Sequence, residues 1–388
     1  SKDMTIVYCI PQIYRPGGIE RIVTIKANYL ADVYGYEVVI VVSNQQGKPP
    51  FYPLSKKVEL VDLGLDYDKI SKYPLLKRLR ERRRFHQIHK KKLAQILMRH
   101  KPDITVSTFT HEVEFLPQIK DGSKKVLEFH FCKGQKRLMA KAFGFSLPTK
   151  LAYYFKCWLE ENVIIAKYNQ FVVLTQEDAE RWKSKISNVI CISNILPFES
   201  EEQAVLKNHK VIAVGRLDAQ KCFSRLIGLW VDVAKKCPDW TLNIYGEGNE
   251  REVLQKQINS LGLSDVVNLC GNSSDIKKHY LESSIFVMTS NYEGMPMTML
   301  EAKSLGLPIV SYDFPCGPKD LIADKIDGRL IRNDDAIEFV DALVSLMRNE
   351  ELRVTYGAKG KENARLYSDI NIMPKWRDLF TSLCSKSK

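Results

Sequence analysis

Residues 211–221 read Val-Ile-Ala-Val-Gly-Arg-Leu-Asp-Ala-Gln-Lys, an apolar run followed at once by a glycine and then by two cations, Arg216 and Lys221. A short β-rich run of this kind predicts a buried strand that ends in a loop. In open α/β sheets, ligands bind beyond the carboxyl ends of the strands. The stretch therefore predicts a doubly wound α/β domain with two cations at its ligand-binding edge.

The same alternation of short apolar runs and helical stretches extends through the whole chain, which is the pattern of βαβ units on a parallel sheet. A first series of strands is predicted at residues 4–10, 37–42, 58–63, 104–108, 125–129, 171–174 and 189–192. A second series is predicted at residues 211–214, 241–245, 266–270, 285–289 and 309–312. We therefore expect two Rossmann-like domains.

The chain has 388 residues, which is too long for one ordinary core at about 150 residues per domain. The polar stretch 199–209 is the expected linker. We predict an N-terminal domain over residues 1–195 and a C-terminal domain over residues 196–366. The last segment, 367–388, has an amphipathic pattern and is expected to pack back on the N-terminal domain.

Charge is distributed unevenly between the two halves. Residues 1–195 carry 33 Lys and Arg against 19 Asp and Glu, a net charge of 33 − 19 = +14, and the remainder carries 25 against 27, or −2. The N-terminal half is therefore expected to face an anionic partner, for which a membrane surface, nucleic acid and a polyanion all remain open.

Much of this excess lies in residues 77–101, where eleven Lys and Arg accompany Glu81 alone and apolar residues recur at helical spacing. A basic amphipathic helix of this kind adsorbs to anionic lipid. The alternatives are a solvated helix face and a nucleic-acid site. The candidate membrane or acceptor residues are Arg82, Arg83, Arg84, Lys90, Lys91 and Lys92.

Nine cysteines, an odd number without any Cys-x-x-Cys spacing, favour a reducing compartment over a disulfide framework or a zinc site. Residues 4–10 begin directly with a strand pattern, and no apolar run reaches the roughly 18 residues that span a bilayer. We expect a cytoplasmic protein without a bound metal.

Two acids separated by seven residues, Glu293 and Glu301, follow the strand predicted at 285–289. Carboxylates that accept from hydroxyls, together with the cations Arg216 and Lys221 for phosphates, suggest a sugar nucleotide as ligand. The alternative for Glu301 is purely structural, because Thr298-x-x-Glu301 has the spacing of a helix-capping box.

Two further candidates lie in the N-terminal half. Gly17 and Gly18 follow the first strand, where they allow a ligand to approach the backbone and leave helix-start amides for an anion, or else form a plain turn. His130 follows the strand predicted at 125–129, between two phenylalanines, and is either a packed side chain or a catalytic one.

These residues together resemble the retaining glycosyltransferases of group 1, also called family four. The resemblance runs over nearly the whole chain and is most specific in residues 214–221, in Gly246-Glu247-Gly248 and in the Glu293-x7-Glu301 segment with Gly306-Leu307-Pro308 after it. It implies the GT-B fold of two facing Rossmann-like domains with a central cleft. One departure is Cys222, which occupies the place where the family usually has glycine, so that the loop is expected to differ in shape.

The resemblance also implies roles for these residues. Arg216 and Lys221 would bind the donor diphosphate, Glu293 the hydroxyls of the transferred sugar and Glu301 those of the ribose, with His130 near the donor sugar. Further donor-binding residues would be Gly17, Gly18, Glu247, Gly294, Met295, Met297 and Thr298. No cofactor and no metal would be needed, because side chains and helix dipoles hold the diphosphate.

The activity implied is retaining transfer of a hexose from a nucleotide-sugar, UDP favoured over GDP, to a lipid-linked or saccharide acceptor in cell-surface polysaccharide biosynthesis. The protein would associate peripherally with the inner face of the cell membrane and would not bind nucleic acid. Two alternatives stay open. One is another GT-B enzyme, such as a sugar-nucleotide epimerase or a phosphorylase, the latter requiring a pyridoxal-phosphate lysine. The other is a non-catalytic polyanion-binding protein, whose binding would depend steeply on salt.

Overall fold

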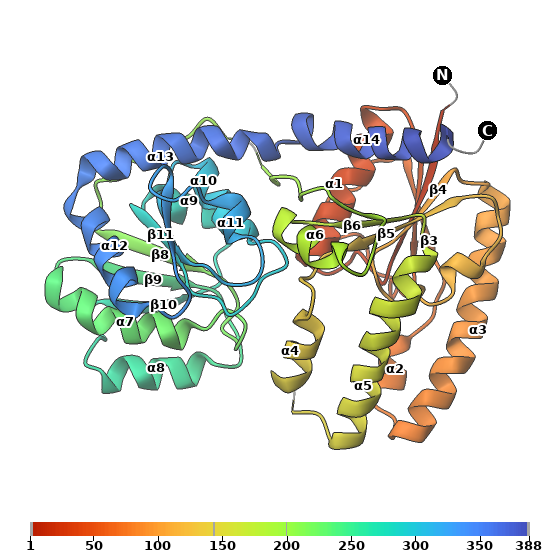
Figure 1. Ribbon diagram of the computed structural model, residues 1–388, viewed down its shortest axis with the longest axis horizontal. Helices are drawn as coiled ribbons and strands as arrows, with labels where there is room; N and C mark the ends of the chain where they lie inside the picture. The colour runs from red at the N-terminus through yellow and green to blue at the C-terminus, as the bar shows by residue number, and fades with distance from the viewer. Residues whose placement is uncertain (1–2, 143, 199, 386–388) are drawn as a thin grey trace. The chain divides into compact units, whose positions relative to one another are not determined.

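The computed structural model describes residues 3–142, 144–198 and 200–385, which form two compact units (Figure 1). Unit 1 consists of Ser1–Leu174, Ala179–Pro197 and Ile372–Lys388. Unit 2 consists of Thr175–Asp178 and Phe198–Asn371. The main change of unit thus falls between residues 197 and 198.

Unit 1 is built on a parallel sheet of seven strands in the order β3-β2-β1-β4-β5-β6-β7. The strands are β1 (Thr5–Ile10), β2 (Glu37–Val42), β3 (Val58–Asp62), β4 (Ile104–Ser107), β5 (Lys124–Phe129), β6 (Gln170–Val173) and β7 (Val189–Cys191). The helices are α1 (Gly18–Asp32), α2 (Tyr67–Ser71), α3 (Leu75–His100), α4 (Gln135–Ala142), α5 (Leu147–Leu159), α6 (Gln176–Lys183), which begins in unit 2, and α14 (Asp369–Ser385), with single turns η1 (Leu116–Gln118), η2 (Glu160–Ile164) and η3 (Ile165–Lys167).

Both faces of this sheet are covered, which explains why its strands are continuously apolar rather than alternating. On β1, Ile6 and Tyr8 point into a core shared with α1 and with the C-terminal helix α14, which contributes Trp376. The intervening Val7 and Cys9 point into the opposite core, which contains residues of α3 and α6. The C-terminal segment therefore completes the core of unit 1.

Unit 2 has a parallel sheet of six strands in the order β10-β9-β8-β11-β12-β13. The strands are β8 (Lys210–Val214), β9 (Thr241–Tyr245), β10 (Val267–Gly271), β11 (Ile285–Met288), β12 (Ile309–Tyr312) and β13 (Gly328–Ile331). The helices are α7 (Phe223–Lys236), α8 (Arg251–Ser260), α9 (Ile276–Leu281), α10 (Met297–Ser304), α11 (Pro318–Leu321), α12 (Ala336–Arg348) and α13 (Glu350–Ala364), followed by the turn η4 (Arg365–Tyr367).

The strand order reverses direction at one place in each unit. In unit 1 the first strand, β1, lies between β2 and β4, and in unit 2 the first strand, β8, lies between β9 and β11. Such switch points are where open α/β sheets bind ligands, beyond the carboxyl ends of the strands. The segments that follow β8 and β11 contain Arg216, Lys221 and Glu293, so the fold places the predicted residues of unit 2 at its switch point.

The basic segment of unit 1 forms one long helix, α3, rather than a pair of helices. No helix in the three described stretches combines the length and the apolar character that crossing a bilayer requires. In Figure 1, α3 and α5 extend together from the sheet of unit 1.

Candidate active site

The loops after β8 and β11 meet in an ion pair between two of the predicted residues. Lys221 Nζ lies 2.5 Å from Glu293 Oε1, and Ser290 Oγ donates to the same oxygen at 2.9 Å. Gln220 Nε2 donates to the other carboxylate oxygen at 3.3 Å. Glu293 is buried, so the pair and these two hydrogen bonds hold its charge in place. Two residues predicted to bind different parts of a ligand thus contact each other.

Arg216 lies in a different environment from Lys221. Its side chain is 82% exposed, and its Nε lies 3.4 Å from an Asp218 carboxylate oxygen. An exposed ion pair of this kind contributes little to stability and is easily exchanged for another partner. Arg216 is therefore the more available of the two cations for an anionic ligand.

Glycines allow the loop after β8 to lie directly against the loop after β9. A Cβ on Gly246, which has a φ of +144°, would lie 1.8 Å from the backbone oxygen of Gly215. A Cβ on Gly248 would lie 2.3 Å from the backbone oxygen of Leu217. The Leu217 amide donates to the backbone oxygen of Glu247 at 3.0 Å, so the loops after β8 and β9 form one rigid backbone surface.

Cys222 adopts a backbone conformation that favours glycine. Its φ is 51° and its ψ is 49°, in the left-handed region, at the position immediately before α7. The expected difference in loop shape stays a prediction. The backbone keeps a glycine-like conformation, and the cysteine side chain makes that conformation more costly.

Glu301 lines a pocket of about 280 Å³ at the carboxyl edge of the sheet of unit 2. Its walls come from the loops after β8, β9 and β10 and from α9 and α10. Burial, followed by the charge of Glu301, raises the pKa of the Tyr280 hydroxyl well above its ordinary value. Lining residues that the sequence reading did not single out are Asn272, Ser273, Ile276 and Tyr280.

Asn272 and Ser273 could have been found from the sequence, because they directly follow a strand, as the predicted ligand-binding loops do. Glu247, which was predicted, also lines the pocket and is paired with Arg251, with 2.6 Å between Oε1 and Nη1. The pocket thus combines two carboxylates, those of Glu247 and Glu301, with the cation Arg216.

The capping-box alternative for Glu301 is wrong. Helix α10 begins at Met297, its N-cap is Pro296, and no side chain caps it. Thr298 therefore lies inside the first turn, and its buried Oγ1 has no hydrogen-bond partner among the described residues. The first turn of α10 leaves backbone N–H groups directed beyond the helix, where a negative charge is favoured.

In unit 1, His130 is held by a chain of buried charges. Its Nε2 lies 3.1 Å from Glu128 Oε2, and the other carboxylate oxygen of Glu128 accepts from Lys26 Nζ. Burial raises the pKa of Glu128, but Lys26 and His130 outweigh this and bring it to about 2. Lys26 in turn lies 4.1 Å from the ring centroid of Trp376 on α14. Because ionised Glu128 can only accept, it fixes Nε2 of His130 as a donor.

Gly17 and Gly18 lie at the carboxyl end of β1 and the start of α1, for which Gly17 is the N-cap. A Cβ on Gly17 would lie 1.9 Å from a carboxylate oxygen of Glu20, which accepts from Gln12 Nε2 at 2.8 Å. A Cβ at Gly17 would therefore displace the carboxylate of Glu20, the far end of a flexible side chain, from this position. Gly17, Gly18 and His130 lie in unit 1, whereas the residues described above them lie in unit 2.

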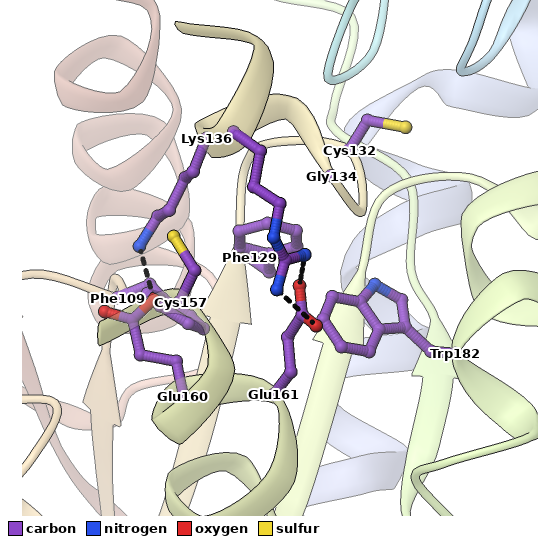
Figure 2. A pocket seen from close by; sticks show the side chains of 10 residues that line it. Phe109, Phe129, Cys132, Gly134, Lys136, Cys157, Glu160, Glu161 and Trp182 are labelled. Carbon is purple, nitrogen blue, oxygen red and sulfur yellow. Dashed lines mark hydrogen bonds and ion pairs between the residues drawn. The ribbon is translucent and has the colours of Figure 1, made fainter. Parts of the chain in front are cut away.

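A second hollow lies in unit 1, lined by residues of β5, α4 and α5 among others, and ion pairs occupy it (Figure 2). Lys136 Nζ lies 3.1 Å from Glu160 Oε2, and Arg137 binds both oxygens of Glu161, at 2.5 and 3.1 Å. The remaining cavity, of about 20 Å³, has room for about one water molecule. It is too small for a sugar, so these groups stabilise unit 1.

The basic residues predicted on α3 are divided between contacts and solvent. Arg82 pairs with Glu114, Lys90 donates to Gln118, and Lys92 donates to the backbone oxygen of Leu63. Arg83 and Lys91 are exposed, as is Arg84, which pairs with Glu81. Only part of the expected basic face is therefore free for a partner.

Comparison with known proteins gives consistent results. The chain is 28% identical to an uncharacterized glycosyltransferase of Haemophilus influenzae, over 96% of this chain and 99% of the other. It is 35% identical to the amylovoran biosynthesis glycosyltransferase AmsD of Erwinia amylovora, over 54% of this chain and 61% of the other. A solved TarM variant from Staphylococcus aureus, in complex with Fondaparinux, alpha-GlcNAc-glycerol and UDP, superimposes with a TM-score of 0.74 at 18% identity, covering 97% of this chain and 99% of the other.

Fold and comparisons together define the class of the protein: two parallel-sheet Rossmann-like domains of the GT-B type, the fold of glycosyltransferases. Residues 197–363 match the family described as glycosyl transferases group 1. This match lies in the C-terminal half of the chain and agrees with the resemblance in its sequence, and the comparisons support glycosyltransferase activity.

Proposed function

We propose that this glycosyltransferase transfers a hexose from a UDP-sugar, with retention of anomeric configuration and without a metal ion, to a lipid-linked or saccharide acceptor in cell-surface polysaccharide biosynthesis. The observation that carries the proposal is the pairing of Lys221 with Glu293 beside the pocket that contains Glu301. A nucleotide-sugar carries its diphosphate between the sugar and the ribose, and Lys221, Glu293 and Glu301 offer one cation and two carboxylates for these three parts. AmsD, named for amylovoran biosynthesis, and TarM, solved with UDP, support the choice of pathway and base.

In the proposed site the donor exchanges partners within the ion pair. The diphosphate takes Lys221 and Arg216, and Glu293 is released to accept hydrogen bonds from hydroxyls of the sugar. The Glu301 carboxylate accepts from the ribose hydroxyls in the 280 Å³ pocket. Because the donor would replace the contact between Lys221 and Glu293, we expect a change of either residue to affect both diphosphate binding and sugar binding.

The chemical step follows from the charge that develops. As the anomeric C–O bond breaks, negative charge grows on the leaving diphosphate, where preorganised cations and the amides at the start of α10 stabilise it. The proton of the attacking acceptor hydroxyl passes to the leaving phosphate on the same face of the sugar, which gives retention. His130, whose Nε2 is oriented by Glu128, is proposed as a further ligand of the donor sugar.

Residues Arg82, Arg83, Arg84, Lys90, Lys91 and Lys92 are proposed to hold the protein at the inner face of the cell membrane, where a lipid-linked acceptor is found. Each Lys or Arg near an anionic surface contributes about 1 kcal/mol. Weak binding to anionic vesicles at low salt, or binding unchanged when these residues are neutralised, would count against this part of the proposal.

The experiment that tests the donor site is a thermal-shift screen with UDP, GDP, ADP and their common sugar conjugates in the presence of EDTA. A ligand at 100 times its dissociation constant adds about 2.7 kcal/mol of stability, which is easily measured as a raised melting temperature. We expect UDP and one UDP-sugar to raise the melting temperature of the wild type and to have little effect on Arg216→Ala. If none of the nucleotides raises the melting temperature of the wild type, or if the shift is equal in Arg216→Ala, the result contradicts the proposed site.

A further inference from the structure

A large groove runs between α3 and α5 in unit 1, away from the loops after β1 and β5. Its volume is about 770 Å³, and its floor includes residues of the segment between β4 and β5. The residues that matter for its chemistry are Arg82, Arg83, His86 and Lys90 from α3 and Phe155 and Lys156 from α5.

The groove holds more positive charge than its own carboxylate can balance. Glu114 is shared, with Oε1 at 3.1 Å from Arg82 Nη2 and Oε2 at 3.6 Å from His86 Nδ1. Lys156 has no ion-pair partner among the described residues. Burial, together with the neighbouring charge of Arg82, lowers the pKa of Lys156 to about 8.

An unused hydrogen-bonding group lies in the same groove. His86 Nε2 is buried and has no hydrogen-bond partner among the residues that the structure describes. Burial, then Arg82 and Lys156, lowers the pKa of His86 to about 4, so the ring is neutral at pH 7 and carries a single N–H. Because Nδ1 lies 3.6 Å from Glu114 Oε2, too far for a hydrogen bond, this N–H can lie on Nε2 and donate without adding charge. The two neighbouring cations, Arg82 and Lys156, and the unpartnered Nε2 of His86 are together suited to a compact anion with several oxygens.

One end of the groove is apolar. Leu79 is 47% exposed and Phe155 is 61% exposed, although both are large hydrophobic residues. The apolar surface continues toward the first turns of both helices with Leu76, 82% exposed, and Leu151, 60% exposed. In Figure 1 the first turns of α3 and α5 lie at the same end of unit 1. A ligand with a charged head and an apolar tail would satisfy both ends.

We propose that this groove binds the phosphate or diphosphate headgroup of a lipid, with Arg82, Lys156 and His86 on the phosphate oxygens and the chain of the lipid along Leu79 and Phe155. The proposal rests on the proposed function for the role of that lipid, which is to carry the acceptor. It differs from adsorption of a basic helix to a membrane, because it assigns binding to the groove and not to exposed cations of α3 such as Arg84 and Lys91.

Isothermal titration calorimetry with a soluble, short-chain phosphatidic acid tests the groove, with pyrophosphate and the corresponding phosphatidylcholine as comparison ligands. We expect phosphatidic acid to bind more tightly than pyrophosphate and the phosphatidylcholine not to bind. Arg82→Gln and Lys156→Gln should each weaken binding about tenfold or more, as for loss of a charge-assisted hydrogen bond. Phe155→Ser should weaken binding of phosphatidic acid but leave that of pyrophosphate unchanged.

Matched controls separate the groove from general electrostatics. Arg99→Gln removes the same charge from α3, and Lys150→Gln removes it from α5, both outside the groove. Arg99→Gln and Lys150→Gln should both bind phosphatidic acid like the wild type. Lys156→Gln should keep the melting temperature of the wild type, because it removes a cation that is repelled by the nearby Arg82. Equal weakening in the controls, or no weakening in Arg82→Gln and Lys156→Gln, would overturn the proposal.

A proton-linkage measurement adds an independent readout. At pH 8 about half of Lys156 is neutral, so binding of an anion should take up about half a proton per lipid in the wild type and none in Lys156→Gln. Competition by a single-stranded oligonucleotide, weakened by the same variants, would assign the groove to nucleic acid instead. UDP binding, measured on the same wild-type sample, separates the proposed donor site from the proposed lipid groove. A sample that binds phosphatidic acid but does not bind UDP would overturn only the donor site.

Discussion

Replacing Lys26 with methionine should destabilise unit 1 strongly, because it leaves the carboxylate of Glu128 buried without its cation. The side chains of Lys26 and Glu128 are only 3% and 2% exposed. Methionine fills a similar volume but carries no charge, so the change removes the ion pair while largely preserving the packing against Trp376. Removing one partner of a buried pair typically costs about 3–5 kcal/mol.

The same magnitude follows from the pKa of Glu128. A fall from the ordinary value of 4.5 to about 2 corresponds to about 3 kcal/mol of stability. Because the folded-state pKa is lowered, this stability is present above pH 4.5 and is lost as the pH falls toward 2. In Lys26→Met, burial instead raises the pKa of Glu128, so lowering the pH neutralises the buried carboxylate and reduces the difference between variant and wild type.

Differential scanning calorimetry between pH 5 and pH 8 is the suitable assay. A loss of about 3 kcal/mol in a unit of this size lowers the melting temperature by about 6–12 °C. Lys26→Met/Glu128→Gln should recover part of the loss, and Lys57→Met, at an exposed position of unit 1, should melt like the wild type. Melting of Lys26→Met within about 1 °C of the wild type, or a deficit in its melting temperature that grows as the pH falls, would contradict this prediction.

Three further changes test the site in unit 2. Cys222→Gly should raise the free energy of unfolding by about 0.5–1 kcal/mol in urea titrations, because φ is 51° there; an unchanged midpoint would argue against strain. Gly246→Ala should abolish UDP binding in calorimetry, since its Cβ would lie 1.8 Å from the Gly215 oxygen, and normal binding would contradict the close packing. Glu301→Gln should weaken UDP binding about tenfold and leave pyrophosphate binding unchanged; equal losses for both ligands would remove its assignment to the ribose.

Local pattern was sufficient to predict most of the fold. Every strand predicted from an apolar run is present, including β8 at 210–214 and β9 at 241–245. The strand that was missed, β13, reads Gly328-Arg329-Leu330-Ile331, and only two of its residues are apolar. It lies at the edge of the sheet, paired to β12 alone, so its sequence is less constrained by burial.

The contacts within the site could not be read from the sequence, because they join residues far apart in the chain. Lys221 and Glu293 are separated by 72 positions, and Lys26 and Glu128 by 102. Spacing alone placed Lys221 and Glu293 after neighbouring strands of one sheet, but it did not show that they pair with each other. Spacing was misleading at Thr298, which lies two residues after the N-cap Pro296 and therefore does not occupy the capping position that a capping box requires.

Lys221 and Glu293 are proposed to form the site of sugar transfer with retention. A ¹H NMR time course of an α-linked UDP-sugar tests this most directly, because it reads the anomeric configuration of the sugar first transferred, to water or to an added acceptor. We predict that the α-anomer appears before mutarotation and that its release is at least about a hundredfold slower in Lys221→Ala and Glu293→Gln, the range for losing one group that stabilises developing charge. The β-anomer appearing first, or undiminished release in both variants, would contradict it.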